Sequence, residues 1–224
     1  MRKLAIACIV VFAAVFTSFA QERYLKPIDE ARLDPSFVAF RSRVIAAAER
    51  RDAKFILSII DPKIRVTFGD VLGIREFKRY FKLERRSDPF WAEFLTVIKN
   101  GGLFVRKNGK RTNRFYAPYT FEGFPEDLDS FSQGVVLGAN VNLRETPSAD
   151  GKIVARLSYN IVTADYENSI KTGELERLVW VKVTTLGGLA GFVSADSFRS
   201  PMDYRAGFSK KAGKWKLDLF ISGD

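Results

Sequence analysis

The chain has 224 residues, 46% of them hydrophobic, and its 36 Lys and Arg against 26 Asp and Glu give a formal net charge of +10. It contains no histidine, and its single cysteine is Cys8. These absences exclude a Cys–His or Ser–His nucleophile and a zinc site of ordinary nitrogen and sulfur ligands. We therefore expect a protein that is not an enzyme and that holds no metal or cofactor.

The first twenty residues have the pattern of a secretory signal peptide. Arg2 and Lys3 precede an apolar run from Leu4 to Phe16, and small residues stand at Ser18 and Ala20. Cleavage near Ala20 would place the mature protein in the periplasm or outside the cell. A retained transmembrane anchor is the alternative, but the apolar run is short for a membrane span.

Residues 21–121 are predicted to form a helical α+β domain. Helices are expected to begin at Asp34, Asp52, Gly73 and Asp88, because Asp caps free backbone amides and the Pro that follows two of these residues fits a first helical turn. Apolar residues recur at helical spacing after each of these starts.

The same domain carries strand patterns. Ile64, Val66 and Phe68 alternate with polar residues, which predicts a strand over 62–69. Residues 102–121 read as two strands around a turn at Asn108-Gly109.

Residues 122–134 form an acidic connector. Glu126, Asp127 and Asp129 could hold calcium through oxygen ligands, but they lack the glycine turn and the ligand spacing of a known calcium loop. A solvated linker is therefore the preferred interpretation.

Residues 135–198 consist of short apolar runs separated by Gly, Asn, Asp or Pro, which predicts a small all-β barrel. Its expected core includes Val141, Leu143, Val154 and Leu157. Residues 199–224 are predicted to form a β-hairpin around Lys211-Ala212-Gly213, with Trp215, Leu217 and Leu219 alternating along its second strand. Two placements remain open: this hairpin completes the sheet of the first domain, or it packs on the barrel.

The barrel segment resembles the bacterial SH3-like domain family. Five elements occur in the family's order: Asn142-Leu143-Arg144, Pro147-Ser148, Gly151, Trp180-Val181-Lys182-Val183 and Gly191-Phe192-Val193. There are two departures. Phe192 replaces the tryptophan of the closing element, and residues 167–178 form a long insertion between two strands.

This resemblance implies a binding module. Members of the family bind cell-wall peptides or polypeptide partners, so we expect a ligand groove formed by Arg144, Tyr159, Tyr166, Trp180 and Phe192. For Arg144 a second interpretation is preferred, in which its guanidinium bonds to carbonyl groups of the following turn.

Residues 49–81 resemble, more weakly, the nuclear-transport-factor-two-like α+β fold, in which helices and a curved sheet line a pocket. The resemblance rests on the predicted order of elements, which is a helix, a short helix, a strand, and then Gly73-Ile74 before another helix. If that pocket were open, Asp70, Glu76 or Glu93 could act as acid and base on a small molecule.

The positive charge is concentrated in residues 36–121, whereas the predicted barrel is close to neutral. A basic patch is predicted from Lys99, Arg106, Lys107, Lys110, Arg111 and Arg114. In an exported protein such a patch would meet an anionic lipid or polymer surface rather than nucleic acid, and a solvated hairpin is the simpler alternative.

The prediction is therefore an exported, noncatalytic binding or scaffolding protein of the bacterial cell envelope. Its partners would be a cell-wall peptide or an envelope protein. The alternative is a small-molecule-binding protein, or a carboxylate-based enzyme, that uses a pocket in the first domain.

Overall fold

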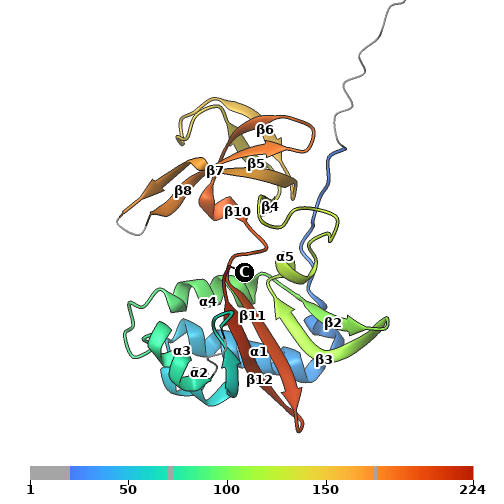
Figure 1. Ribbon diagram of the computed structural model, residues 1–224, viewed down its shortest axis with the longest axis vertical. Coiled ribbons are helices and arrows are strands. Elements are labelled where there is room, and N and C mark those ends of the chain that lie inside the picture. The colour runs from blue at the N-terminus through green and yellow to red at the C-terminus, as the bar shows by residue number, and fades with distance from the viewer. Residues whose placement is uncertain (1–20, 70–72, 174–175, 224) are drawn as a thin grey trace, which may run out of the picture.

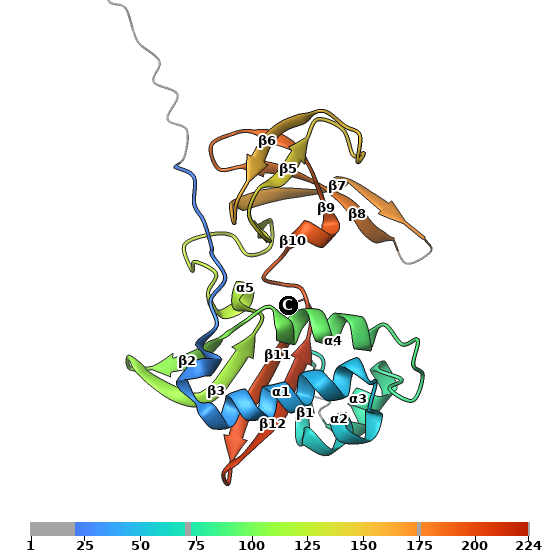
Figure 2. The ribbon, with the colours of Figure 1, turned by 180° about the vertical axis from the view of Figure 1, so that it is seen from behind.

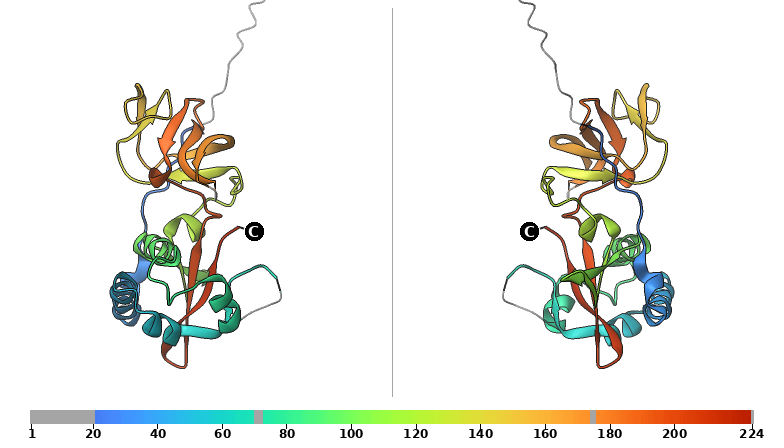
Figure 3. Two further views of the ribbon diagram at one scale, coloured as in Figure 1. Left: turned by 90° about the vertical axis from the view of Figure 1, so that its left-hand side faces the viewer. Right: turned by 90° about the vertical axis from the view of Figure 1, so that its right-hand side faces the viewer.

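The computed structural model describes residues 21–69, 73–173 and 176–223. They form a mixed α+β structure with one five-stranded and one seven-stranded sheet, and the latter curls into an antiparallel half-barrel. We call residues 30–122 with 205–221 the helical lobe, and residues 133–199 the β lobe. Figures 1 and 3 show the β lobe stacked on one end of the helical lobe.

The sheet of the helical lobe has the strand order β1-β12-β11-β3-β2. The strands are β1 (Ile60–Arg65), β2 (Leu103–Lys107), β3 (Lys110–Ala117), β11 (Arg205–Lys211) and β12 (Lys214–Ile221). The C-terminal hairpin β11–β12 is inserted between β1 and β3, with β12 parallel to β1 and β11 antiparallel to β3. Of the two placements left open by the sequence, the hairpin therefore takes the first.

Both hairpins of this sheet use the turn residues expected from the sequence. Asn108 and Gly109 have φ of 51° and 73°, and Ala212 and Gly213 have φ of 46° and 76°. Two consecutive positive φ angles suit a tight hairpin turn, because its twist matches the twist of the strands.

A bulge changes the buried face of β12. The register shifts between Gly207 and Phe208 of β11. Trp215 and Leu217 are buried as expected, but beyond the bulge Leu219 is only half-buried and Phe220 takes the inward position. The prediction that Leu219 shares the face of Trp215 and Leu217 is wrong, because one extra residue reverses the alternation.

Helices α1 (Pro35–Glu49) and α4 (Phe90–Lys99) cover one face of this sheet (Figure 2). The other helices of the lobe are η1 (Glu30–Leu33), α2 (Ala53–Ile59), α3 (Ile74–Tyr80) and the short α5 (Tyr119–Glu122). Asp34 caps α1 by accepting bonds from the amides of Ser36 (2.9 Å) and Phe37 (3.1 Å). Asp52 caps α2 in the same way through Phe55. These caps confirm the predicted helix starts.

Aromatic side chains fill the space between helices and sheet. Phe37 of α1 is fully buried, and its ring lies 4.3 Å from that of Phe115 and 4.7 Å from that of Trp215, measured between centroids. A second group surrounds Phe90 of α4, which stacks on Phe94 at 4.9 Å and meets Phe220 edge to face at 5.3 Å. The helices and the sheet are thus joined by a continuous apolar core.

The strand predicted over 62–69 is placed differently. β1 covers Ile60–Arg65, so it begins earlier and ends before Phe68. The ring of Phe68 is 48% exposed and lies against the guanidinium of Arg205, 5.4 Å from centroid to Cζ. The alternation of apolar and polar residues thus extends beyond the end of the strand. Phe68 packs on Arg205 instead of entering the core.

The sheet of the β lobe has the order β10-β4-β7-β8-β9-β5-β6. Its strands are β4 (Gln133–Val136), β5 (Val141–Arg144), β6 (Ile153–Leu157), β7 (Ile161–Thr172), β8 (Arg177–Thr185), β9 (Ala190–Ser194) and β10 (Phe198–Arg199), with η2 (Ala195–Ser197) between the last two. Of the insertion noted in the sequence, residues 167–172 lengthen β7 and residues 177–178 lengthen β8, and the two strands protrude as a pair (Figure 1).

The core of the β lobe matches the expected residues in part. Leu143 and Leu157 are buried, whereas Val141 is half-buried and Val154 is 37% exposed. The prediction for Val154 is wrong, because β6 is an edge strand with β5 as its partner on one side.

Residues 21–29 run along both lobes as an extended strap. Glu22 accepts bonds from the Gly187 amide (2.9 Å) and the Asn160 side chain (3.0 Å) of the β lobe. Leu25 is buried in a small apolar cluster with Tyr119, Val135 and Ile161, which come from both lobes. This cluster fastens the two lobes together.

Within the described parts of the chain, no helix is both long and apolar enough to cross a membrane. The predicted signal peptide, residues 1–20, lies outside the described residues.

Candidate functional site

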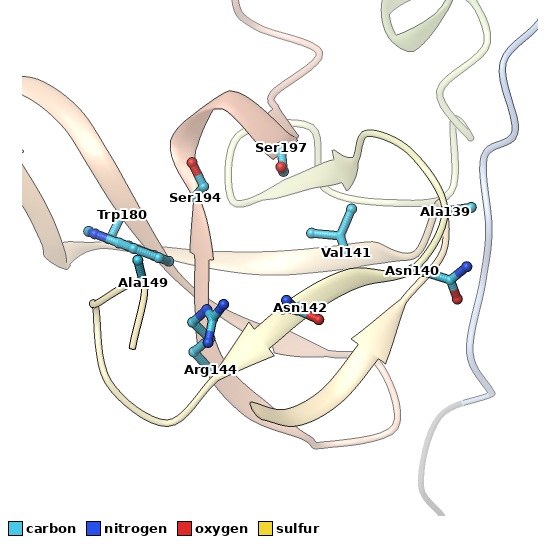
Figure 4. Close-up of a pocket in the computed structure, with 9 residues that line it drawn as sticks. All are labelled: Ala139, Asn140, Val141, Asn142, Arg144, Ala149, Trp180, Ser194 and Ser197. Atoms are coloured by element: carbon cyan, nitrogen blue, oxygen red, sulfur yellow. The ribbon is translucent and has the colours of Figure 1, made fainter. Parts of the chain in front are cut away.

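A groove of about 510 Å³ crosses the β lobe, and we call it the Arg144 groove (Figure 4). β5 and the residues before it form one side, and β8, β9 and η2 form the other. Its lining consists of Ala139, Asn140, Val141, Asn142, Arg144, Ala149, Trp180, Ser194 and Ser197. Arg144 and Trp180, two residues predicted to bind a ligand, thus line one groove.

Arg144 also holds the turn that follows β5. Its Nη1 donates to the carbonyl oxygen of Gly151 at 2.6 Å, and the Glu145 amide bonds to Lys152 across the same turn at 2.9 Å. A Cβ atom on Gly151 would lie 2.5 Å from Oγ1 of Thr146, so the turn is compact enough to require glycine. The predicted bond from the Arg144 guanidinium to a carbonyl group of the turn is therefore present.

Trp180 stands on β8 directly across from Ser194 of β9. Its ring is half-buried, and its indole nitrogen has no hydrogen-bond partner among the described residues. An indole that is partly buried and keeps a free N–H can both stack on a ligand and donate a hydrogen bond to it. The exposed side chain of Ile170, across from Trp180 on β7, adds apolar surface beside it.

The other predicted ligand-binding residues lie elsewhere. Tyr159 has φ of 60°, and its backbone bonds to Gly138 and to Leu25 of the strap. Tyr166 faces the space between the two lobes. Phe192 is the cross-strand partner of Arg144, but it does not line the groove. Tyr159, Tyr166 and Phe192 are therefore not among the residues that line the Arg144 groove.

Most of the predicted basic patch is engaged within the chain. Four pairs are Lys99 with Glu49 at 2.6 Å, Arg106 with Glu30 at 2.5 Å, Arg114 with Asp218 at 3.3 Å, and Arg111 with the Leu33 carbonyl group. Lys107 and Lys110 remain exposed, opposite each other at the tip of the β2–β3 hairpin. Within the predicted patch, the unpaired positive charge is therefore confined to the tip of this hairpin and does not form a continuous surface.

Two of the three candidate acids, Glu76 and Glu93, are each paired with an arginine. Glu76 is buried but binds Arg79 at 2.5 Å, and Glu93 binds Arg199 at 3.0 Å. Asp70 lies outside the described residues. The apolar core described above fills the space between helices and sheet in the helical lobe, where the predicted pocket would lie.

Two of the connector acids have structural partners. Asp127 binds Arg23 of the strap, and this ion pair together with its hydrogen bond lowers the pKa of Asp127. Asp129 accepts bonds from the Ser132 hydroxyl and the Phe131 amide, which lower its pKa. Within residues 21–69, 73–173 and 176–223 there is no cluster of three or more His, Cys, Asp or Glu that could hold a metal ion.

The sequence did not indicate the other residues of the groove. Asn142, Ala149 and Ser194 are small or polar, and they line the groove only because β5, the turn and β9 meet there. Gly191 allows this meeting, since a Cβ atom on it would lie 2.7 Å from the Arg144 carbonyl oxygen.

Comparison of the chain with protein-family models, with curated proteins and with solved structures found no match in any of the three. The function is therefore argued from the residues of the chain itself.

Proposed function

We propose that this protein is an exported, noncatalytic binding protein of the bacterial cell envelope, and that the β lobe is an SH3-like barrel whose Arg144 groove recognises a cell-wall peptide. The observation that carries the proposal is the pairing of Arg144 and Trp180 in one groove, with the indole N–H of Trp180 unused within the described residues. The order of the sequence elements shared with the bacterial SH3-like family supports it.

The groove has the features of peptide recognition. Trp and Arg are the residues that most often dominate binding energy at interfaces, because each combines a large contact area with directional hydrogen bonds. The Arg144 side chain is already held by Gly151, so its remaining N–H groups are oriented before a ligand arrives. Such preorganisation reduces the entropy lost on binding.

Lys107 and Lys110 at the hairpin tip supply a second, weaker contribution. In an envelope protein they would approach anionic lipids or polymers, and this attraction would fall as salt screens it.

The test is retention of the purified protein on insoluble peptidoglycan at low and moderate salt. We expect retention at both, with Trp180→Ala causing at least a tenfold loss of affinity. Phe131→Ala is the matched control, because Phe131 is an aromatic residue that is 61% exposed and lies outside the groove. The variant with Lys107→Gln and Lys110→Gln should lose affinity at low salt alone.

Absence of retention at both salt concentrations would overturn the proposed recognition of the wall. Equal retention of the Trp180→Ala variant and the parent would overturn the role of the groove.

A further inference from the structure

A second cleft, of about 570 Å³, lies between the two lobes, and we call it the interlobe cleft. Helix α4 forms its floor through Glu93 and Thr96, and the protruding β7–β8 hairpin overhangs it with Tyr166, Arg177 and Leu178 (Figure 1). The segment that joins β10 to β11 closes one end. Arg177 and Leu178, at the end of the long insertion, thus contribute to a wall of this cleft.

Charges of both signs line the interlobe cleft. The acids are Glu93, Asp196 and Asp203, and the bases are Arg177 and Arg199. Glu93 forms an ion pair with Arg199, with 3.0 Å between Oε1 and Nη2. Neither Asp196 nor Arg177 has an ion-pair partner among the described residues. A chain that is strongly basic overall therefore presents an excess of acid here.

Arg199 is the most deeply placed of these groups. Its side chain is only 6% exposed, and Nη2 donates to Glu93 and to the Tyr204 carbonyl oxygen, the latter at 2.6 Å. Its Nε is buried and has no hydrogen-bond partner. A buried donor without a partner is costly, so this group favours an acceptor that enters the cleft.

Asp203 is the complementary group. The residue is exposed at the surface, and one of its oxygens, Oδ2, accepts a bond from the Ser200 amide at 3.0 Å. The surrounding walls of the cleft nevertheless remove part of the water around the carboxyl group, and this raises its pKa. Repulsion from Glu93 adds to the effect, whereas Arg199 and the Ser200 amide act in the opposite direction. A cation beside Asp203 would stabilise the ionised carboxylate.

The remaining walls are apolar or aromatic. They include Tyr166, Leu178, Val181, Phe198 and Tyr204. The Tyr166 ring lies 6.4 Å from that of Phe198, and Tyr204 stacks on Phe220 at 4.8 Å, both measured between centroids. These surfaces suit a short aliphatic or aromatic side chain.

We propose that the interlobe cleft binds a small zwitterion, an apolar α-amino acid, with its ammonium group at Asp203 and Asp196 and its carboxylate at Arg177 and Arg199. A purely cationic ligand would leave Arg177 and the Nε of Arg199 without an acceptor, and a purely anionic ligand would be repelled by the acids. A zwitterion satisfies both sets of charges at once.

The test uses three matched probes and the purified protein. L-leucine carries both charges, 3-methylbutylamine lacks the carboxylate, and 4-methylpentanoate lacks the ammonium group. Titrations followed by amide chemical shifts should show L-leucine perturbing Thr96, Leu178 and Asp203. Each truncated probe should bind about tenfold more weakly or worse, the loss typical of one charge-assisted contact.

Two variants assign the two ends of the ligand. Arg177→Gln should weaken L-leucine about tenfold and leave the amine unaffected. Because Arg177 is exposed, this variant is expected to fold. Asp203→Asn should weaken L-leucine and the amine but not the carboxylate. Trp180→Ala, in the Arg144 groove, is the control and should bind L-leucine as the parent does.

The proposal is overturned if L-leucine perturbs no amide of the cleft, or if the amine or the carboxylate binds as tightly as L-leucine. This outcome is independent of peptidoglycan retention, which tests the Arg144 groove.

Discussion

Arg144 Nη1 donates a hydrogen bond to the Gly151 carbonyl oxygen at 2.6 Å, so a single guanidinium both closes the turn after β5 and lines the groove beside Trp180. The two interpretations that the sequence left open for Arg144 are therefore compatible. A side chain held by the turn presents its other N–H groups in a defined direction.

Replacement of Arg144 should affect stability as well as binding. Arg144→Ala removes a charge-assisted bond, so we expect the free energy of unfolding to fall by about 1–2 kcal/mol. The Glu145 amide, which bonds to Lys152 across the same turn, should exchange with solvent faster. Urea denaturation and amide hydrogen exchange measure these effects. If Arg144→Ala leaves this amide as protected as in the parent, the bond to Gly151 does not stabilise the turn.

Gly191 should tolerate no side chain. A Cβ atom would lie 2.7 Å from the Arg144 carbonyl oxygen and 2.8 Å from Leu143 Cγ, so Gly191→Ala must separate β9 from β5. We expect a loss of about 2–3 kcal/mol in urea denaturation, typical of an overpacked core.

Gly69→Ala is the control for this substitution. Its Cβ atom would meet nothing closer than Thr67 Oγ1 at 3.7 Å, and stability should be nearly unchanged. Equal stability of the two variants would contradict the close approach of β5 and β9.

The Glu93–Arg199 pair should contribute to the attachment of the two lobes. Glu93→Gln leaves the buried Arg199 without its counterion, and we expect the free energy of unfolding to fall by about 1–3 kcal/mol, since Glu93 is partly exposed. Lys152→Gln is the control, because Lys152 and Glu145 lie 3.9 Å apart and are both largely exposed. Similar small effects of the two substitutions would show that the interlobe pair does not stabilise the protein.

The carboxylate of Asp34 should make the free energy of unfolding depend on pH. The Ser36 hydroxyl and the Phe37 amide bond to its carboxylate and Lys210 lies 3.6 Å away, so its pKa is lowered although burial acts in the opposite direction. A lowered pKa gives stability that is present above the unfolded pKa of roughly 3.9 and is lost as the pH falls through the folded value.

The variant Asp34→Asn keeps an oxygen that can cap α1 but removes the charge. At pH 6 we expect it to be less stable than the parent by about 0.5–1 kcal/mol, and the difference should shrink below about pH 3. Unfolding in urea at both pH values measures this difference. A difference that is the same at both would mean that the charge of Asp34 has no role.

Local sequence signals predicted the elements that depend on neighbouring residues. Asp34 and Asp52 cap helices because their carboxylates reach amides two or three positions away. Asn108-Gly109 forms a turn because Asn and Gly readily adopt positive φ, and Gly213 does so in the turn with Ala212. Errors appeared where a distant contact decided the outcome, as at Phe68, which packs on Arg205, and at Leu219, which follows a bulge.

The sequence by itself determined the caps, the hairpin turns, the alternation of most strands and the absence of histidine, since each depends on residue type or on neighbours in the chain. Only the tertiary structure decided that β11 and β12 lie between β1 and β3. It also decided that Trp180 and Arg144 line the same groove while Tyr166 faces the interlobe cleft. The physical reason is that strand order and the curl of a sheet follow from the burial of apolar side chains far apart in sequence, which local patterns do not encode.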